Sequence, residues 1–303
     1  MSRASQASPS HPPVCGTVTG EVSGVFLSVG RAGEHSIPAI EPSDRMHRQW
    51  SAGDDQRIAA GYRLEAEAFV GRRRLGPGRL VLDAACGSGT ATLPAARTGA
   101  VVTGIDLVAG AVEAASALAG RESLPVAFDQ GSAERLPYRD GAFDVVLSLF
   151  GVMFAARPDL VLAELARVTR PGSLVALASW MPAGFVADLL AIRSRAAPPP
   201  FDLPDPLRWG DRSVVGEWFE DDVWQMTAQV RRLRIRYPYA PAGVVELFRA
   251  AHGPTVRAFE SLGEDRRADL AGELAAHWAR HRDPTAAGTE VETEYLEVVA
   301  VRR

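Results

Sequence analysis

The stretch Val81–Thr90, VLDAACGSGT, decides the fold of this chain. Its apolar beginning predicts a strand buried on both faces, and the residues after it follow a helical pattern. Gly87 and Gly89 lie between the two, where the lack of a Cβ atom lets the main chain approach a ligand closely. The stretch therefore predicts a strand, a ligand-binding turn and a helix in direct succession.

Strand and helix patterns alternate on both sides of this stretch. Strands are predicted at 79–83, 101–106, 126–129, 142–149 and 174–180, and helices at 54–74, 88–97, 109–119 and 158–168. This alternation is typical of an α/β fold in which a doubly wound, mostly parallel sheet carries helices on both faces.

The patterns divide the chain into four segments. Residues 1–45 are rich in Ser, Pro and Gly and are expected to be a disordered leader, with Met46 as a hypothetical translation start. Residues 46–180 are expected to form the ligand-binding core, and residues 181–289 a cap that contacts the substrate. Residues 290–303 return to the sheet as its final strand. Within the cap, helices are predicted at 185–195, 211–219, 241–251 and 265–280, and a strand at 223–237.

The basic residues have an unusual composition. All 33 of them are Arg, because the sequence contains no Lys, and it contains no Asn either. Codon bias in a GC-rich bacterial genome accounts for this. The absence of Lys excludes enzymes that need a lysine amine, such as Schiff-base aldolases, pyridoxal-phosphate enzymes and nucleotidases with a Walker-A loop.

Charge and cysteine content narrow the possible partners. The formal net charge is −4, so there is no excess of cations to hold a nucleic acid. No apolar stretch approaches the ~20 residues of a membrane span. Cys15 and Cys86 are too few for a disulfide framework and match no zinc spacing, so we predict a cytoplasmic protein without a metal site. The oligomeric state stays open.

Two carboxylates at strand ends indicate the ligand. Asp83 precedes the glycine turn, where it would repel a pyrophosphate but attract a sulfonium or an ammonium group. A dinucleotide site would also have a small residue where this chain has Thr92. Asp106 ends the next strand, from which a carboxylate can bind both hydroxyls of a ribose. S-adenosylmethionine has a ribose and a positive charge but no diphosphate, so it is the ligand that these residues indicate. The alternative function is that of a nicotinamide-dependent oxidoreductase.

Beyond this turn, several further segments match one family in the right order. They are Val101–Leu107 (VVTGIDL), Gly131–Pro137 (GSAERLP), Asp140–Ser148 (DGAFDVVLS), Glu164–Gly172 (ELARVTRPG) and the closing strand around Tyr295. With these the chain resembles the class I S-adenosylmethionine-dependent methyltransferases, in particular the small-molecule branch that includes the ubiquinone and menaquinone type. The resemblance implies a seven-stranded Rossmann-like sheet with a C-terminal cap. A protein that binds the cofactor without turnover is a further alternative.

The resemblance also implies the cofactor contacts near the first two strands. Gly87 and Gly89 would lie behind the methionine part of the cofactor. Asp106 would bind the ribose, and Leu107 would pack on the adenine.

Further along the chain the resemblance places the rest of the cofactor site. Ser132 and Ala133 would flank the edge of the adenine, although the family usually carries Asp at the first of these positions. Ser148, Leu149 and Phe150 would line the mouth through which the methyl group leaves.

Candidates for the substrate side come from the residues themselves. Phe150, Met153 and Phe154 follow the fourth strand, where ligands bind in such sheets, so they line a pocket or belong to the core. Trp50 either closes over the cofactor or packs at the edge of the sheet. The acceptor is expected to be a small molecule, because the chain lacks the acid-Pro-Pro-aromatic motif of nucleic-acid methyltransferases at Ser148.

Methyl transfer needs a base only if the acceptor is protonated. His252, in a turn after a cap helix, is the candidate for this role, and His47 is a weaker one. His277 and His281 are four residues apart on one predicted helix and are interpreted as solvated. Cys86 is interpreted as a buried packing residue rather than a nucleophile.

Overall fold

The computed structural model describes residues 42–199, 203–220 and 223–303. Most of the expected leader therefore lies outside the described residues. Helix α1 (Pro42–Trp50) begins inside the stretch 1–45 that the composition assigned to this leader. Met46 is a buried residue of this helix rather than the first residue of an ordered segment.

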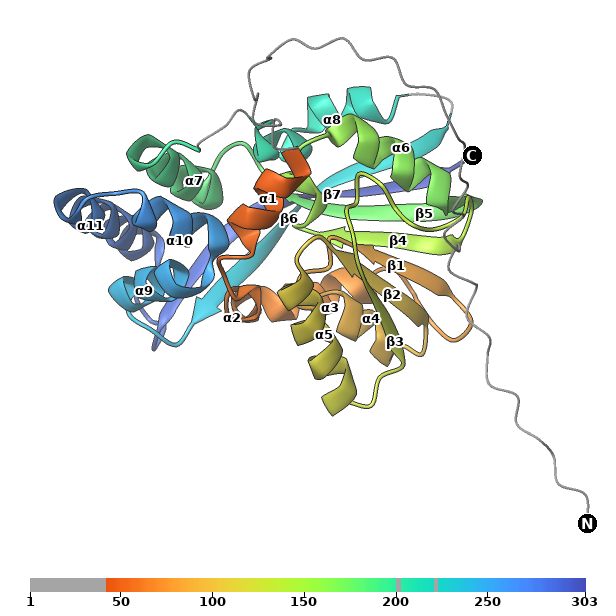
Figure 1. The fold of residues 1–303 in the computed structure, drawn as a ribbon, viewed down its shortest axis with the longest axis horizontal. Coiled ribbons are helices and arrows are strands. Elements are labelled where there is room, and N and C mark those ends of the chain that lie inside the picture. Colours follow the sequence, from red (N-terminus) through yellow and green to blue (C-terminus); the bar gives the residue numbers. More distant parts are fainter. Residues whose placement is uncertain (1–41, 200–202, 221–222) are drawn as a thin grey trace, which may run out of the picture. The chain divides into compact units, whose positions relative to one another are not determined.

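A seven-stranded sheet forms the centre of the fold, in the order β3-β2-β1-β4-β5-β7-β6 (Figure 1). The strands are β1 (Leu80–Ala84), β2 (Val101–Asp106), β3 (Val126–Gln130), β4 (Phe143–Leu149), β5 (Thr169–Trp180), β6 (Trp224–Tyr237) and β7 (Thr289–Arg302). Neighbours from β3 to β5 pair in parallel, and β7 runs antiparallel to both β5 and β6. The sheet confirms the α/β class, and its strand order reverses direction between β1 and β4.

Apart from the helix predicted at 88–97, which begins only at Thr92, the described helices follow the predicted ones with three exceptions. They are α2 (Asp55–Ala59), α3 (Arg63–Gly71), α4 (Thr92–Arg97), α5 (Ala109–Arg121), α6 (Pro158–Val168), α7 (Phe185–Ala196), α8 (Arg212–Trp218), α9 (Pro241–Ala251), α10 (Gly253–Glu260) and α11 (Glu264–His281). Helices α1 and α10 were not predicted. The third exception is the single helix expected at 54–74, which is broken by a 3-10 turn at Ala60–Tyr62.

The break has a visible cause at Gly61. A Cβ atom at this position would lie 2.5 Å from the ring of Tyr237 on β6, so only glycine permits the approach. The hydroxyl of the same Tyr237 donates a hydrogen bond to the carbonyl oxygen of Ile58, at 2.7 Å. The contact with β6 thus fixes the turn that separates α2 from α3.

The segment 181–289 supplies both helices and a strand. Its strand β6 pairs along its whole length with β7 and forms the edge of the sheet, while α7, α9, α10 and α11 pack against one another beyond that edge (Figure 1). The N-terminal helices touch this group. A Cβ atom on Gly253 would lie 2.5 Å from the carbonyl oxygen of Gln49, and one on Gly53 would lie 2.2 Å from that of Ala251. The joints α1–α2 and α9–α10 are therefore in close main-chain contact.

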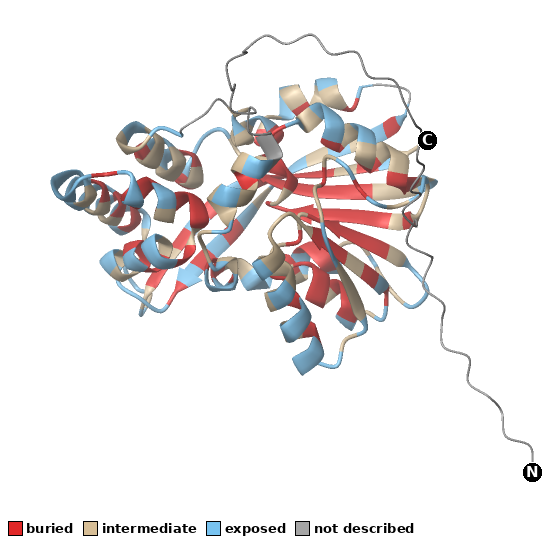
Figure 2. Ribbon diagram, in the orientation of Figure 1, coloured by how far each residue is buried: buried red, intermediate tan, exposed pale blue. Residues whose placement is uncertain are grey.

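The core fills both faces of the central strands, which are buried along most of their length (Figure 2). Asp144 accepts a hydrogen bond from the Leu80 amide at 2.9 Å and pairs with Arg170, so it anchors the starts of β1 and β4. No helix in the described part of the chain is long and apolar enough to span a membrane.

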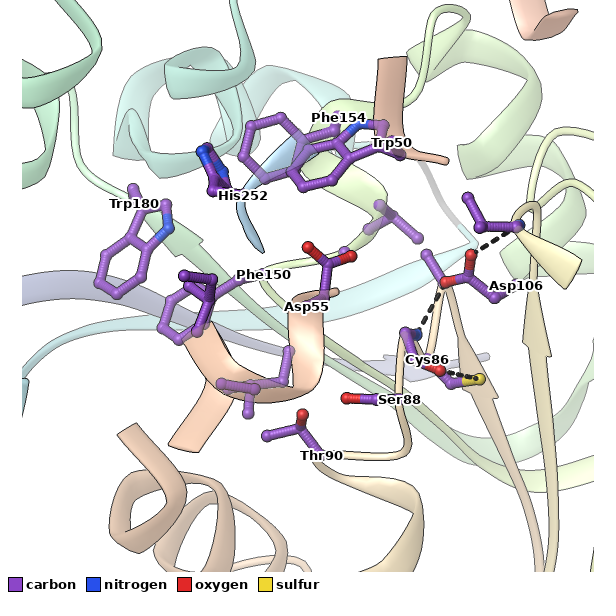
Figure 3. A pocket seen from close by; sticks show the side chains of 18 of the residues that line it. Trp50, Asp55, Cys86, Ser88, Thr90, Asp106, Phe150, Phe154, Trp180 and His252 are labelled. Carbon is purple, nitrogen blue, oxygen red and sulfur yellow. Dashed lines mark hydrogen bonds between the residues drawn. The ribbon is translucent and has the colours of Figure 1, made fainter. Parts of the chain in front are cut away.

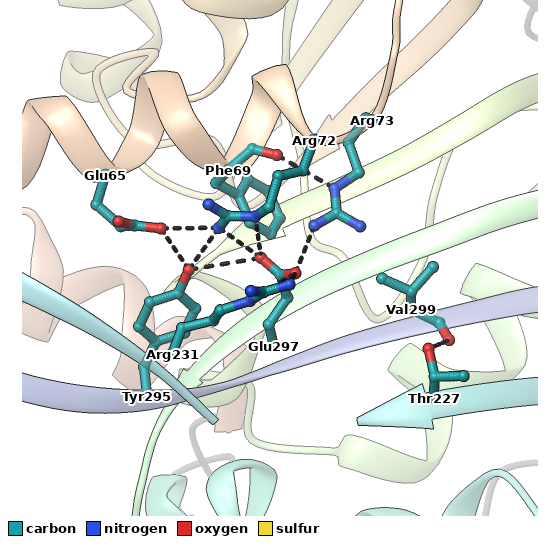
Figure 4. A network of polar contacts seen from close by, with 9 residues as sticks. All are labelled: Glu65, Phe69, Arg72, Arg73, Thr227, Arg231, Tyr295, Glu297 and Val299. Carbon is teal, nitrogen blue, oxygen red and sulfur yellow. Dashed lines mark hydrogen bonds and ion pairs between the residues drawn. The ribbon is translucent and has the colours of Figure 1, made fainter. Parts of the chain in front are cut away.

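One buried charge fastens α3 to the sheet (Figure 4). Glu297 on β7 is only 3% exposed. Its carboxylate accepts a hydrogen bond from the guanidinium of Arg72 at 2.9 Å and forms an ion pair with that of Arg73 at 2.8 Å. Burial alone would raise the pKa of Glu297, but these interactions keep it below its ordinary value. The hydroxyl of Tyr295 donates to Glu65 at 2.5 Å and extends the network.

Candidate functional site

A cavity of about 250 Å³ lies at the carboxyl ends of β1, β2 and β4, and residues of α1, α2, α7 and α9 form its other walls. Because the strand order reverses between β1 and β4, this is the crevice where ligands bind in open α/β sheets. The cavity therefore coincides with the turn that the sequence singled out.

Two residues next to the strand ends have a positive φ, a backbone conformation that residues other than glycine rarely adopt. Ala85 after β1 has a φ of 55°, and Phe150 after β4 has a φ of 58°. The following Gly151 brings the two turns together, because its Cβ atom would lie 2.3 Å from the carbonyl oxygen of Ala85. Strain of this kind is typical of functional sites. It directs the Phe150 ring into the cavity, where it stacks on Trp180 with centroids 3.8 Å apart (Figure 3).

Asp106 holds the glycine turn in place at the end of β2. Its carboxylate accepts hydrogen bonds from the amide of Gly87 at 2.7 Å and from that of Val108 at 2.9 Å (Figure 3). A carboxylate has about four acceptor positions, so two remain for a ligand. Burial raises the pKa of Asp106 above its ordinary value. The residue lines the cavity, where it is available to a ribose as the sequence suggested.

Asp83 also lines the cavity from the end of β1. It is buried and accepts a hydrogen bond from the Thr92 hydroxyl at 2.6 Å. Burial, together with the charge of Asp106, raises its pKa to about 7. A cation placed in the cavity would lower this pKa and be attracted in return.

Asp55 is a third carboxylate of the cavity, and the sequence reasoning missed it. It belongs to α2 and lies in the middle of the cavity wall between Phe150 and Asp106 (Figure 3). Burial raises its pKa to about 7, with further contributions from the charges of Asp106 and Asp54. Within the described residues its carboxylate has no hydrogen-bond or ion-pair partner. The only sequence signal was its place in the first turn of a helix, which is common for acidic residues.

The two glycines of the turn have different surroundings. Gly87 lines the cavity, has a φ of 52° and has open space where a Cβ would be. Gly89 is not among the described residues that line it, which corrects the expected cofactor contact. Its φ is 86°, and a Cβ there would be 3.4 Å from the side chains of Leu93 and Ala115. Gly89 thus serves the conformation of the turn and its packing.

The expected adenine side of the site lines the cavity as a group. Leu107 follows β2, and Ser132 and Ala133 follow β3. The hydroxyl of Ser132 accepts a hydrogen bond from the Glu134 amide at 3.1 Å, so it is engaged within its own turn. Leu149 at the end of β4 also lines the cavity.

Ser148 and Met153 were expected at the site, but neither is among the described residues that line the cavity. Ser148 is fully buried, donates to the carbonyl of Ala84 at 2.8 Å and accepts from the amide of Val152 at 3.0 Å. It therefore ties β4 to β1. Met153 is 2% exposed and belongs to the core, whereas its neighbour Phe154 lines the cavity.

Trp50 and His252 meet at the side of the cavity opposite the glycine turn (Figure 3). The Trp50 ring lies 4.9 Å from that of Phe154 and 5.5 Å from that of His252, measured between centroids. The Nδ1 atom of His252 is 2.7 Å from the Thr255 hydroxyl. Burial, and then the charge of Arg193, lower the pKa of His252 to about 3. A ring that binds a proton so weakly is poorly suited to be the general base that the sequence suggested.

His277 is not solvated, contrary to the interpretation of the sequence. It is 1% exposed, stacks on Phe185 with centroids 4.7 Å apart, and its Nε2 atom lies 2.9 Å from the carbonyl oxygen of Phe185. Side chains of Asp188, His277 and His281 bring possible metal ligands within 4.8 Å of one another. The Arg280 guanidinium lies 3.4 Å from the Nδ1 atom of His277, so a positive charge already stands beside this group.

The residues of the cavity fit S-adenosylmethionine. Asp55 and Asp83 carry raised pKa values there, which is the environment that an ammonium or sulfonium group stabilises. A diphosphate would add negative charge beside them and be repelled. Cys86 has a pKa well above its ordinary value because of burial, so its thiol is not an activated nucleophile.

Comparisons with known proteins agree with this geometry. The family described as "Methyltransferase domain" matches residues 82–177. The chain is 33% identical over 267 residues to the uncharacterized protein Rv1405c of Mycobacterium tuberculosis (strain H37Rv). The aligned region covers 85% of this chain and 94% of that protein. It is 30% identical over 190 residues to the demethylmenaquinone methyltransferase of Renibacterium salmoninarum, which covers 57% of this chain and 75% of the relative.

Among solved structures, the YcgJ protein of Bacillus subtilis has a similar fold. The superposition gives a TM-score of 0.55 with 18% sequence identity, and it covers 79% of this chain and 98% of that one.

Proposed function

The chain belongs to the class I S-adenosylmethionine-dependent methyltransferases, and from this premise we propose that it methylates a small, largely apolar molecule held between the cofactor and the cap. The supporting observation is the aromatic wall of the cavity. The rings of Phe154, Trp50, His252 and Phe248 follow one another there in this order, with centroid separations between 4.9 and 5.5 Å. Such a wall suits a flat or apolar acceptor.

The proposed cofactor contacts follow from the residues that line the cavity. Asp106 binds the ribose hydroxyls, Leu107 and Ala133 pack against the adenine, and the main chain at Gly87 faces the methionine part. Asp55 and Asp83 balance its positive charges. Bound there, S-adenosylmethionine supplies a methyl group activated by its own sulfonium.

The protein then contributes position rather than a covalent step. Phe150 and Leu149 border the opening toward the cap, and Trp50 closes the cavity from the N-terminal side. Holding the acceptor in line with the methyl–sulfur bond can supply up to ~7–11 kcal/mol of the barrier reduction. The apolar walls also exclude water, which would otherwise compete as an acceptor.

We further propose that segment 181–289 is the substrate region, in which α7 and α9 form the walls that face the acceptor. Residues 46–180 carry the cofactor site, and residues 290–303 complete the sheet. We expect the reaction to take place in the cytoplasm.

Two measurements test the proposal. In a thermal-shift assay, S-adenosylmethionine at 100 times its dissociation constant should add about 2.7 kcal/mol of stability, and NADH should add none. Transfer of a labelled methyl group to a panel of small aromatic acceptors should then give product. Stabilisation by NADH alone would favour a nicotinamide-dependent oxidoreductase. Cofactor binding without transfer to any acceptor would favour a binding protein without turnover.

A further inference from the structure

Helix α7 presents one face to the cavity. Val186, Leu189, Leu190 and Arg193 all line it, and their spacing places them on one side of a helix. The first three are apolar, so Arg193 is the only charged member of that face. Phe185, at the start of the helix, packs instead against His277.

The guanidinium of Arg193 has no counter-charge within the described residues. No hydrogen bond or ion pair joins it to another described side chain, and burial, the sole cause, lowers its pKa to about 10. It is close enough to His252 to lower the pKa of that ring as well. By contrast, Arg195 on the same helix is exposed and pairs with Glu273 at 3.4 Å.

An unpaired, half-buried cation on a cavity wall is unfavourable unless something supplies the opposite charge. The four carboxylates that line the cavity do not do so, because neither hydrogen bonds nor an ion pair link Arg193 to any of them, namely Asp55, Asp83, Asp106 and Glu134. The cavity therefore has an acidic part at the strand ends, an aromatic wall, and a cation on the cap. A guanidinium binds carboxylate and phosphate groups through paired hydrogen bonds.

Resting on the function proposed above, we propose that Arg193 is the anion-binding residue of the acceptor site, and that the acceptor is an apolar or aromatic molecule with a carboxylate or phosphate group. The anion contacts Arg193, the apolar part lies against Trp50 and Phe248, and the atom to be methylated faces the opening beside Phe150. The neutral ring of His252 lies near the anion and can share in its hydrogen bonding.

The test uses two pairs of probes that differ only in charge, benzoate with benzamide and 2-naphthoate with 2-naphthamide. Binding is measured by calorimetry on the full chain saturated with S-adenosylhomocysteine. The wild type should bind at least one of the carboxylates at least tenfold more tightly than its amide, a difference of 1.4 kcal/mol. R193Q should lose this preference and R193K should keep part of it. The matched control R195Q should behave as the wild type.

Two accompanying measurements separate the inference from its alternatives. The affinity of R193Q for S-adenosylhomocysteine should stay within about twofold of the wild type. A tenfold loss would assign Arg193 to the carboxylate of the cofactor and overturn the proposal. The melting temperature of R193Q should be equal or higher, because the substitution removes an unpaired, half-buried charge.

The proposal is also overturned if the wild type shows no preference for either carboxylate, or if the preference survives in R193Q. If the wild type does not bind S-adenosylhomocysteine, the proposed function fails. The same probes applied to the protein alone then still decide whether Arg193 binds anions.

Discussion

Asp55 offers a quantitative test of how the cavity binds its cofactor. In the unliganded protein its pKa is about 7, because the carboxyl is buried near two other acidic groups. A bound sulfonium or ammonium group stabilises the ionised form, so binding below pH 7 requires the loss of a proton. The ionisation of Asp55 should therefore make the wild type bind S-adenosylmethionine more tightly as the pH rises. D55N should lack this contribution to the affinity.

The magnitude follows from the pKa. For a group with a pKa of about 7 the ionised fraction rises about tenfold between pH 6 and pH 8, which corresponds to about 1.4 kcal/mol. The α-amino group of the ligand titrates in the same range, with a pKa of about 8. Titration of the ligand affects the wild type and D55N equally. It therefore cancels in the ratio of their dissociation constants.

The assay is calorimetric titration with S-adenosylmethionine at pH 6, 7 and 8. The ratio of the two dissociation constants should grow about tenfold across this range. D269N, which removes an exposed carboxylate from α11, should show a constant ratio to the wild type. A ratio for D55N that does not change with pH would refute the assignment of Asp55 to the charge of the cofactor.

The same groups affect the unliganded fold. The pKa values of Asp55 and Asp83 lie above the value of about 3.9 for an unfolded chain. Such carboxyls stabilise the fold fully at low pH, and this contribution is lost as the pH rises through 7. The unliganded protein should therefore melt at a lower temperature at pH 8 than at pH 6. In D55N this difference between the two melting temperatures should be smaller.

Three further substitutions test other parts of the account. D106A should weaken binding of S-adenosylmethionine at least about tenfold in calorimetry, the equivalent of one charge-assisted hydrogen bond, and an unchanged affinity would remove the ribose assignment. E297Q should lower the free energy of unfolding, measured in urea, by about 3–5 kcal/mol, because it leaves Arg72 and Arg73 without their buried partner. The control E294Q removes an exposed carboxylate and should lower it by less than about 1 kcal/mol. Equal effects of the two substitutions would contradict the role of the network. G151A should destabilise the fold by about 1–3 kcal/mol and weaken cofactor binding, because its Cβ would lie 2.3 Å from the carbonyl of Ala85; normal stability and affinity would show that the two turns can separate freely.

Several strands and the helices that begin with proline could be predicted from the sequence almost to the residue, whereas β5 begins at Thr169, five residues before its predicted start. The strand predicted at 101–106 and the helices predicted at 158–168 and 241–251 have those bounds in the structure. Both helices begin with a proline, which fixes where they start. Helix α10 was missed because its Gly-Pro beginning has the composition of a turn.

The cofactor end of the site was predictable for a different reason. Asp83, Gly87 and Asp106 stand at ends of adjacent strands, so the order of the sheet brings them together once the strands are identified. Ser148 was assigned to the site only from the family resemblance, which does not say which residues at the end of β4 face the cavity. Its side chain bonds to Ala84 instead.

The walls of the cavity that lie far away in sequence could not be predicted. Asp55 and Arg193 come from α2 and α7, and only tertiary packing brings them to the same cavity as the glycine turn. The spacing of Val186, Leu189 and Arg193 indicates one face of a helix, but a sequence does not say what that face contacts. Arg193 was therefore indistinguishable from a surface arginine such as Arg195.

A crystal structure of the protein with S-adenosylhomocysteine tests the central claim most directly. We predict that both ribose hydroxyls lie within hydrogen-bonding distance of Asp106, that the ammonium group faces Asp83 or Asp55, and that the sulfur points toward the opening beside Phe150. A ligand bound elsewhere, or one with its ribose away from Asp106, would contradict the account.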